Sequence, residues 1–497
     1  MLRKAKPLIP AAIILFWVGM MAALVYREVV VPARHPEMGA VRVSEPQSVW
    51  MGLLYDGARI GFIHWTTTPE TRSGDPGYRL RLMARINMPV MGRPIGMDLD
   101  GTGWQSGLRG LREFDFSFRA GEHDLRVVGG VEEDQLRATV ETAGESMPLV
   151  LPIGRALSLG GGMGLSSMNM PPLSPGQTVY VESFDPTTMS VGRAKLEALE
   201  KAVLQVSGEA VETVLIATTI GGITTRAWVN DKQEVIRAET PFGIILEKIS
   251  PEQALDRLGQ DEQADMLKGV AVTPAGPAPR RDARRMLVRI GGVPEDLMPP
   301  DGPAQCRNGD VYELLQLDPA AHGAGDDMIT GPEAERNLAG DAFITVEHEK
   351  IQTLAGEITG QEEDLWTRAL RVHDWVFNNI EKKNTLSMPS ALEVLRTREG
   401  DCNEHSVLYV ALARAAGVPA RPAIGLAWSE ELQAFGYHAW AEVYAGRWTP
   451  VDPTFGQPSA DATHIKLFDG GIEQWPRLLG YVGKLRIEVL ETEQENP

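Results

Sequence analysis

The pattern of apolar and polar positions changes character along this 497-residue chain. Residues 8–26 form a run without a charged side chain, which is long enough to cross a bilayer as a helix. From about residue 41 to residue 249, apolar residues recur at every second position, which predicts strands. In the last third they recur at every third or fourth position, which predicts helices.

The alternation between residues 41 and 249 indicates an antiparallel β-rich domain. Residues 78–88 carry one apolar face and one largely polar face, as expected of a strand with one side on a core. We expect a half-barrel or a sandwich that fills its own concave face, with a short helix within residues 190–206. Further strands are predicted at residues 59–68, 111–119, 123–128, 135–141, 210–220, 223–230 and 235–240. Asn230 and Asp231 are turn residues between the last two of these strands.

A different pattern follows residue 250. Residues 251–268 look helical, and the sequence Val-Thr-Pro-Ala-Gly-Pro-Ala-Pro at residues 272–279 then predicts a linker with restricted geometry. Strands at residues 286–290 and 311–317 are expected to pair, leaving Cys306 in their connection. Helices are predicted at residues 351–358, 362–380 and 390–395, and the acidic tail at residues 491–497 is expected to lie in solvent.

These patterns predict a multidomain chain of α+β class. We expect a cytoplasmic tip and transmembrane anchor at residues 1–30 and a large antiparallel β-rich exported domain at residues 31–250. Residues 251–332 would supply a helix, a Pro-rich linker and a small β segment. Residues 333–497 would form an α+β domain with the candidate chemistry.

Flanking charges give the N-terminal run an orientation. Arg3, Lys4 and Lys6 precede it, and an excess of basic residues keeps that end cytoplasmic, so the bulk of the chain is expected on the periplasmic or extracytoplasmic side of an inner membrane. A cleavable signal peptide is the alternative. Residues 20–23, Met-Met-Ala-Ala, offer no clean small-x-small cleavage site before a polar start, which favours an uncleaved, single-pass anchor.

Charge and cysteine content exclude some classes of function. A formal net charge of -19 disfavours binding to nucleic acid or to an anionic membrane surface by bulk electrostatics. Two cysteines in a chain of this length exclude a disulfide framework. We therefore expect no nucleic-acid partner, and neither a cofactor nor a metal site is predicted.

One cysteine stands where nucleophilic chemistry is favoured. Cys402 opens an apolar run that continues to residue 416 and ends at Gly417, with Pro419 two positions later, which predicts a buried helix beginning near Cys402. Unpaired backbone N–H groups and the positive end of the helix dipole stabilise a thiolate in the first turn. Cys402 is therefore a candidate nucleophile.

A histidine and an aspartate follow on a predicted hairpin. Residues 437–443 and 447–452 read as two strands joined across Tyr-Ala-Gly at residues 444–446. A three-residue loop with Gly446 in the left-handed conformation places Val443 opposite Arg447 and His438 opposite Asp452. A two-residue loop would put the imidazole and the carboxylate on opposite faces.

Three ordered blocks of sequence resemble the transglutaminase-like superfamily of papain-type cysteine enzymes. They are Thr-Arg-Glu-Gly-Asp-Cys at residues 397–402 with Gly-Val-Pro-Ala-Arg at residues 417–421, His-Ala-Trp at residues 438–440, and Trp448 through the Val-Asp-Pro-Thr of residues 451–454. The resemblance covers roughly the last third of the chain. It implies a papain-type domain with Cys402 as nucleophile, His438 as general base and acid, and Asp452 as the carboxylate that orients the imidazole.

The resemblance implies chemistry on amide bonds through a thioester acyl-enzyme, followed by hydrolysis or transamidation. Asp401-Cys402-Asn403 replaces the Gln-Cys-Trp of the protein-crosslinking members, which makes hydrolysis at least as plausible as crosslinking. Papain-like enzymes carry glutamine as an oxyanion donor six positions before the cysteine, but Arg396 stands here, so only the Cys402 N–H is identified. The expected partner is a protein or peptide of the cell envelope.

Three alternatives stay open. His405, three residues after Cys402 on the same helical flank, is a rival base, or the two residues form part of a metal site. The remaining alternative to an enzyme is a noncatalytic binding or assembly module of the envelope that keeps the enzyme fold only as a scaffold. Labelling of Cys402 by a thiol probe separates an enzyme from such a module.

Overall fold

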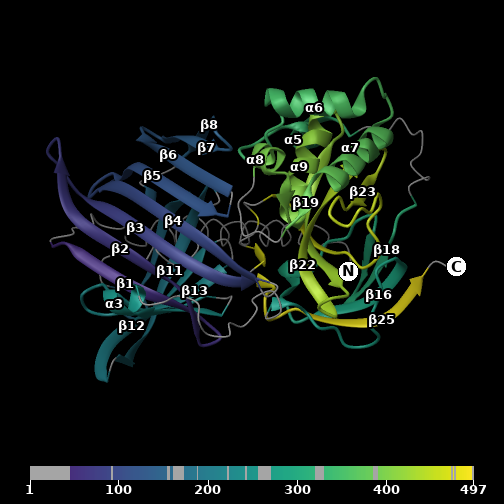
Figure 1. Ribbon diagram of the computed structural model, residues 1–497. Helices are drawn as coiled ribbons and strands as arrows, with labels where there is room; N and C mark the ends of the chain where they lie inside the picture. Colours follow the sequence, from purple (N-terminus) through teal and green to yellow (C-terminus); the bar gives the residue numbers. More distant parts are fainter. Residues whose placement is uncertain are drawn as a thin grey trace, which may run out of the picture.

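The computed structural model describes residues 45–494, except 91–92, 122, 154–156, 160–172, 187–188, 207, 221–222, 241–242, 256–269, 319–328, 384–389, 472–473, 475–476 and 479. A β-rich domain lies beside a mixed α+β domain (Figure 1). The expected transmembrane segment at residues 8–26 and most of the expected helix at residues 251–268 lie outside the described residues. Among the helices that are described, none has the length and apolar character needed to span a membrane.

The N-terminal domain is one sheet of 15 strands, in the spatial order β8 to β1 followed by β15 to β9. Neighbouring strands are antiparallel except β9 and β10, which are parallel. The strands are β1 (Gln47–Tyr55), β2 (Ala58–Arg72), β3 (Asp75–Val90), β4 (Arg93–Ser106), β5 (Gly110–Ala120), β6 (His123–Glu132), β7 (Gln135–Thr142), β8 (Glu145–Pro152), β9 (Leu157–Leu159), β10 (Thr178–Asp185), β11 (Ser190–Val206), β12 (Glu209–Ile220), β13 (Ile223–Val229), β14 (Val235–Glu239) and β15 (Ile244–Lys248).

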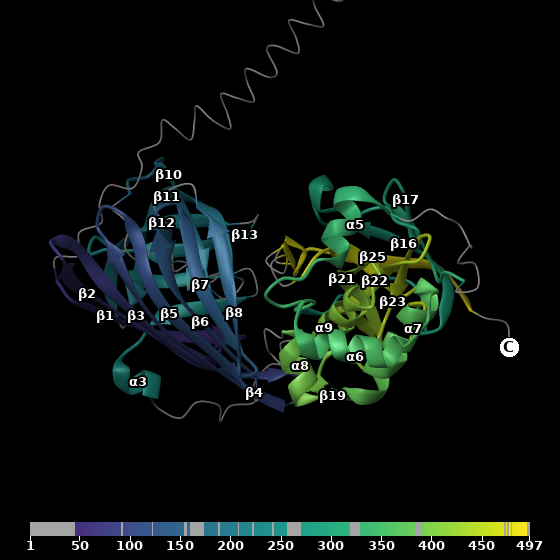
Figure 2. The ribbon, with the colours of Figure 1, turned by 90° about the horizontal axis from the view of Figure 1, so that it is seen from above.

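The sheet curves strongly, so that its two arms face each other (Figure 2). Buried residues of β1–β3 pack with residues of β10–β13, and Phe114 of β5 meets Phe184 of β10 with ring centroids 5.0 Å apart. The domain thus combines the curvature of a half-barrel with the face-to-face packing of a sandwich. The described side chains of the two arms form shared apolar clusters, which a sheet that fills its own concave face requires.

All of the strands expected between residues 59 and 240 are present, but the helix expected within residues 190–206 is wrong. This segment is β11, and Ala194, Leu196 and Ala198 are buried in alternation with more exposed neighbours. Its Ala, Leu, Glu and Lys residues favour a helix in isolation. Pairing with β10 on one side and β12 on the other satisfies its backbone as a strand, and this tertiary context outweighs the local propensity.

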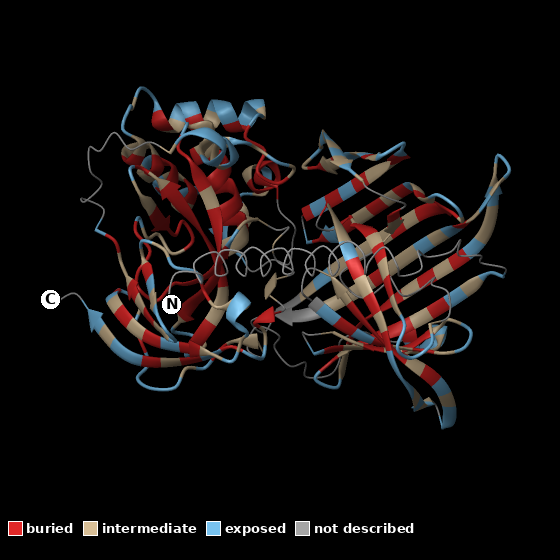
Figure 3. Ribbon diagram, turned by 180° about the vertical axis from the view of Figure 1, so that it is seen from behind, coloured by how far each residue is buried: buried red, intermediate tan, exposed pale blue. Residues whose placement is uncertain are grey.

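The C-terminal domain packs helices against a four-stranded sheet in the order β23-β22-β21-β24. Helix α9 lies at its centre and is buried along most of its length (Figure 3). The predicted helices at residues 351–358, 362–380 and 390–395 are confirmed as α6, α7 and α8. The elements are α5 (Gly331–Leu338), α6 (Glu349–Thr359), α7 (Leu365–Asn379), β19 (Glu381–Lys382), α8 (Ala391–Thr397), β20 (Glu399–Gly400), α9 (Cys402–Ala415), β21 (Ala420–Ser429), β22 (Ala434–Tyr444), β23 (Trp448–Val451) and β24 (Ile465–Asp469).

A second four-stranded sheet, in the order β17-β18-β16-β25, completes this domain. The predicted pairing of residues 286–290 with 311–317 is confirmed, but Cys306 lies in strand β17 of their connection. Residues 491–494 of the acidic tail are exposed or half-exposed, as expected, and they belong to strand β25. Together with the short helix η3 (Glu295–Leu297), its elements are β16 (Ala283–Gly291), β17 (Gln305–Asn308), β18 (Val311–Leu315) and β25 (Arg486–Gln494). The short helix α3 (Pro251–Leu255) instead packs against β1 of the β-rich domain (Figure 1).

The β segment expected within residues 251–332 is therefore not a separate unit. Its buried side chains share one core with residues of β21, β22 and β24. The Pro-rich stretch before it runs along the domain, because Val272 exchanges backbone hydrogen bonds with Phe435 and Ala275 bridges to Glu488. Patterns of local polarity could not reveal these contacts between segments distant in sequence.

The two domains meet around the side chain of Glu393 on α8, which is 1% exposed. Its carboxylate accepts hydrogen bonds from the Asp124 N–H (2.8 Å) and the Thr142 hydroxyl (3.0 Å) of the β-rich domain. His123 Nδ1 lies 3.6 Å away, and Arg396 approaches at 3.7 Å. Burial raises the pKa of Glu393 to about 7. This interface fixes α8, which leads through β20 into Cys402.

We expect the Glu393→Gln variant to be more stable than the wild type above pH 7 and equally stable near pH 5. A buried carboxyl with a raised pKa destabilises the fold increasingly as pH rises from its ordinary value of 4.5 to about 7. Each pKa unit corresponds to about 1.4 kcal/mol, so the gain approaches ~3 kcal/mol at pH 8. Glutamine resembles the protonated side chain, since it can accept from Asp124 and donate to Thr142.

Thermal unfolding at pH 5 and pH 8 measures this difference. Glu357→Gln, a change at an exposed position of α6, is the control and should show no pH-dependent gain. An equal stability difference for Glu393→Gln at both pH values would contradict the prediction.

Candidate active site

Helix α9 begins where the sequence predicted and carries Cys402 in its first turn. Asp401 is the N-cap, and its carboxylate accepts a hydrogen bond from the Asn403 N–H at 3.0 Å. Glu404 completes a capping box by accepting from the Asp401 N–H at 2.9 Å. These local bonds fix the backbone that presents the sulfur.

The thiolate expected at Cys402 is not favoured in the resting structure. Burial of the sulfur raises the pKa of the Cys402 thiol well above its ordinary value, and the carboxylate of Asp401 raises it further. Burial is the main reason for the difference from the prediction, and the capping box adds to it by bringing the carboxylates of Asp401 and Glu404 to the helix end, where they offset the dipole. A hydrogen bond from the Ala439 N–H to the sulfur acts in the opposite direction.

The hairpin that carries His438 and Asp452 differs from the prediction in its register. Tyr444 pairs with Trp448, and Val443 pairs with Thr449 rather than with Arg447. The loop therefore consists of residues 445–447, with Gly446 at φ 84°. The shift is two positions, and an even shift keeps every side chain on its expected face. His438 and Asp452 consequently remain on one face as diagonal neighbours.

The imidazole and the carboxylate meet, as the sequence predicted. His438 Nε2 lies 2.7 Å from Asp452 Oδ2, and both side chains are buried. The other oxygen, Oδ1, accepts hydrogen bonds from the N–H groups of Thr454 (2.7 Å) and Phe455 (2.9 Å). His438 and His464 hold the pKa of Asp452 well below its usual range although burial acts against this. Asp452 is therefore ionised.

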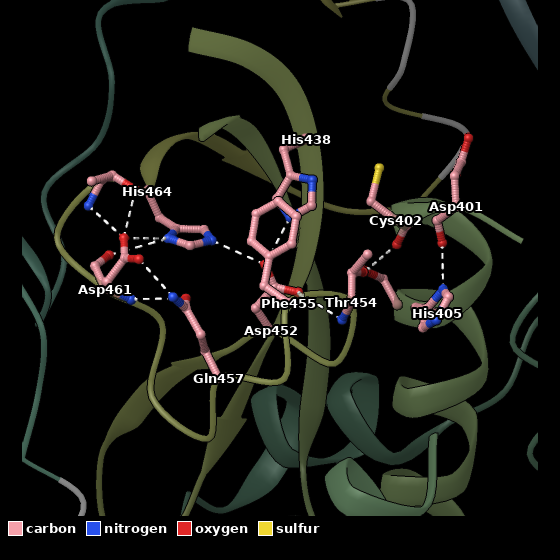
Figure 4. Close-up of polar contacts among 12 residues, drawn as sticks. Asp401, Cys402, His405, His438, Asp452, Thr454, Phe455, Gln457, Asp461 and His464 are labelled. Carbon is pink, nitrogen blue, oxygen red and sulfur yellow. Dashed lines mark hydrogen bonds and ion pairs between the residues drawn. The ribbon is translucent and has the colours of Figure 1, made fainter. Parts of the chain in front are cut away.

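An ionised Asp452 determines the tautomer of His438. A carboxylate only accepts, so Nε2 carries the hydrogen and Nδ1 keeps its lone pair. Figure 4 shows the sulfur of Cys402 on the side of the His438 ring that is turned away from Asp452. Burial lowers the pKa of His438, with the attraction of Asp452 opposing it. The arrangement provides a neutral imidazole beside a thiol.

The sequence analysis missed two residues that extend this chain of contacts. His464 Nε2 lies 3.0 Å from Asp452 Oδ2, and His464 Nδ1 lies 3.3 Å from Asp461 Oδ1. Both ring nitrogens thus face carboxylates, and these contacts raise the pKa of His464 to about 9 despite its burial. A cationic His464 between two anions stabilises the ionised form of Asp452 (Figure 4).

Asp461 is itself held by several donors. Its carboxylate accepts from the backbone and hydroxyl of Thr463, at 2.8 Å and 2.5 Å, and from the Gln457 amide at 2.6 Å. Glycine at position 425 lets the strand after His464 approach closely, because a Cβ there would lie 2.0 Å from the Ile465 oxygen. The only sequence signal for this group was an Asp-x-x-His pair shortly after Asp452, in a stretch without periodicity.

Comparison with known proteins agrees with this geometry. Residues 352–453 match the family model described as the transglutaminase-like superfamily. The chain carries a transglutaminase-like domain. Among curated proteins, none matches the sequence.

The solved structures that the chain resembles share little sequence with it. A candidate cysteine protease from Cytophaga hutchinsonii is 18% identical over 45% of this chain and 85% of that chain, with a TM-score of 0.28. A β-barrel-like protein of a domain of unknown function from Brucella abortus is 12% identical over 42% and 98%, with a TM-score of 0.31. A candidate protease from Parabacteroides distasonis is 10% identical over 59% and 71%, with a TM-score of 0.20.

The positions of the described side chains bear on two alternatives to the triad, which are His405 as the base and a metal site. His405 lies in the same helix as Cys402, but its Nδ1 is 2.7 Å from the Asp401 carbonyl oxygen and its buried Nε2 has no hydrogen-bond partner among the described residues. Figure 4 shows its ring on the side of α9 away from the sulfur. His405 is therefore not placed to be the base.

One group of described side chains has a composition suited to a metal ion. One ligand atom from each of His438, Asp452 and His464 lies within 4.8 Å of the others. However, hydrogen bonds between the two imidazoles and the shared carboxylate oxygen already account for this approach. Cys402 and His405 do not belong to the group.

The phenyl ring of Phe455 covers one face of the His438 imidazole. Phe455 stacks on His438 with centroids 4.3 Å apart and planes inclined by 4°. The ring centroids of Trp440 and His438 are 6.2 Å apart. Apolar cover of this kind excludes water from the His438–Asp452 hydrogen bond and strengthens it.

Proposed function

We propose that this protein is a cysteine enzyme that acts on amide bonds through a thioester acyl-enzyme. The observation that carries the proposal is the orientation of His438, whose Nε2 is held by Asp452 at 2.7 Å while its other edge faces the Cys402 sulfur. The papain-like scaffold and the family match of residues 352–453 support it. The roles of nucleophile, base and orienting carboxylate belong to Cys402, His438 and Asp452.

The protonation states set the first chemical step. Because the thiol and the imidazole are both neutral at rest, His438 Nδ1 accepts the thiol proton as the sulfur attacks the amide carbon. We assign the Cys402 N–H as the donor to the oxygen that becomes negative. His438 then donates its proton to the departing nitrogen, and a thioester to Cys402 remains.

The second step decides between two reactions. Water at the thioester gives hydrolysis, whereas a substrate amine gives transamidation. The structure has no glutamine at the expected oxyanion position, since Arg396 lies in α8 beside Glu393. We infer that the enzyme is at least as well suited to hydrolysis as to crosslinking.

We also propose that the enzyme is anchored in an inner membrane and works on the extracytoplasmic side. The apolar run at residues 8–26 and the basic residues before it support this orientation. Proteins or peptides of the cell envelope would then be its substrates.

Mass analysis of envelope peptides incubated with the purified protein tests the reaction. New carboxyl termini or loss of amide nitrogen would indicate hydrolysis, and isopeptide-linked pairs would indicate transamidation. Neither product, under conditions in which the folded protein is intact, would contradict an enzymatic function and favour a noncatalytic envelope module.

A further inference from the structure

Arg281 places a positive charge next to the candidate catalytic imidazole. It lies just before β16, in the basic stretch that follows the Pro-rich segment. Its guanidinium carbon lies 3.1 Å from the centroid of the Phe455 ring. Because Phe455 stacks on His438 with its other face, the guanidinium, the phenyl ring and the imidazole form three successive layers. Cation–π contact with this partly buried ring fixes the outermost layer.

The backbone N–H and the Nε of Arg281 are hydrogen-bonded, whereas the two terminal nitrogens of its guanidinium are not, within the described part of the chain. Its Nε donates to the Trp428 carbonyl at 3.0 Å, and its backbone N–H donates to Glu430 Oε1 at 3.2 Å. Among the described residues, its two terminal nitrogens have no hydrogen-bond partner. The side chain is only half-buried, and neither nitrogen is enclosed. Four N–H donors of a fixed guanidinium are therefore available to a ligand.

The nearest carboxylates do not neutralise this arginine by direct contact. Asp452, Asp461 and Glu430 attract its charge, yet none forms an ion pair with it. Asp452 and Asp461 instead bond to His464 and to backbone N–H groups. Glu430 accepts from the Arg281 backbone and from the Gln433 amide.

We propose that Arg281 binds a carboxylate of the substrate on the leaving-group side of the scissile amide. This inference rests on the proposed function. His438 is the group that protonates the departing nitrogen, so we place the leaving amine on the His438 side of the sulfur, where Phe455 stacks on the imidazole and Arg281 on Phe455. A carboxylate on the carbon next to that nitrogen can meet the guanidinium in a bidentate pair. The favoured substrates are amides whose departing amine is an amino acid with a free carboxylate.

The reaction balances without a further reagent. The Cys402 sulfur forms a bond to the carbonyl carbon, the carbon–nitrogen bond breaks, and the thiol proton passes through His438 to the departing nitrogen. The released product is the free amino acid, with its carboxylate on Arg281. Water then cleaves the thioester and restores the thiol.

Alkylation of Cys402 tests the subsite without a known substrate. Iodoacetate carries a carboxylate next to the reacting carbon, whereas iodoacetamide has the same shape and no charge. In a Cys306→Ser background, the Arg281→Gln change should slow iodoacetate about tenfold and alter iodoacetamide by less than about twofold, given the strength of charge-assisted hydrogen bonds. Arg281→Lys, which keeps the charge, should retain part of the preference.

Arg280→Gln is the matched control. Arg280 is the neighbouring residue, is 66% exposed and lies 3.7 Å from Asp282, so its removal should leave both rates within about twofold. An iodoacetate-to-iodoacetamide ratio that is equal in the wild type and in Arg281→Gln, with both reagents reacting, would overturn the subsite and leave the proposed enzyme standing. Failure of both reagents to alkylate Cys402 would refute the proposed function and the subsite together.

A peptide mixture supplies a second measurement. The same mixture is prepared with free C-terminal carboxylates and with C-terminal amides, and release of the last residue is followed by mass spectrometry. The wild type should prefer the acid form by about tenfold or more, and Arg281→Gln should bring the ratio near one. Equal cleavage of both forms by the wild type would overturn the proposal.

Discussion

Replacing Cys402 with alanine should abolish labelling by an activity-based thiol probe and lower amide turnover by about a thousandfold or more. In the proposed reaction the sulfur is the atom that bonds to the carbonyl carbon, so its removal takes away the nucleophile. Probe labelling near pH 7.5 and product analysis by mass spectrometry measure the two effects. The change leaves Asp401 and Glu404 in place, so the cap of α9 should persist.

Cys306→Ser is the control for this experiment. Cys306 lies exposed on β17, in a different sheet from His438. This variant should keep both labelling at Cys402 and turnover. Equal labelling of the Cys402→Ala and wild-type proteins in the Cys306→Ser background would contradict the assignment of the nucleophile. Unfolding temperatures of the variants distinguish a lost sulfur from a lost fold.

Replacing Asp452 with asparagine should reduce kcat/KM by about a thousandfold and destabilise the domain by about 3 kcal/mol. Asp452 accepts from two imidazoles through Oδ2 and from two backbone N–H groups through Oδ1. An amide has one acceptor oxygen, so its NH₂ group must face one of these pairs of donors. His438 would lose its fixed tautomer, and with it the base beside Cys402.

Steady-state kinetics and denaturant unfolding measure the two effects. Asp469→Asn is the matched control, because Asp469 is 41% exposed and forms its ion pairs with Lys466 and Arg421 away from the triad. It should change kcat/KM by less than about twofold. Turnover of Asp452→Asn within about tenfold of the wild type would show that Asp452 does not orient the imidazole.

The residues of the proposed triad could be selected from the sequence, but their protonation could not be predicted from it. Cys402 was identified from the start of an apolar helix, and that start is confirmed at the residue expected. The helix end alone suggested a thiolate. The actual state follows from burial of the sulfur and from the carboxylates of Asp401 and Glu404, whose positions depend on the folded cap.

The hairpin shows how a wrong detail can leave a correct conclusion. The sequence placed the loop one residue too early, and the register was wrong by two positions. Since side chains in a strand alternate with a period of two, His438 and Asp452 stayed on one face. His464 and Asp461 had no such periodicity to mark them, because they lie in an irregular segment that only the packing of β21 against β24 brings to Asp452.

By itself, the sequence determined the local elements: the alternating strands, the amphipathic helices, the capped start of α9 and the order of cysteine, histidine and aspartate. These depend on side chains close together in the chain. Only the tertiary structure decided that β11 is a strand, that β25 joins β16, and that Arg281, Phe455 and His464 surround the triad. Each of these depends on contacts between distant segments, whose burial and hydrogen bonding outweigh local preference.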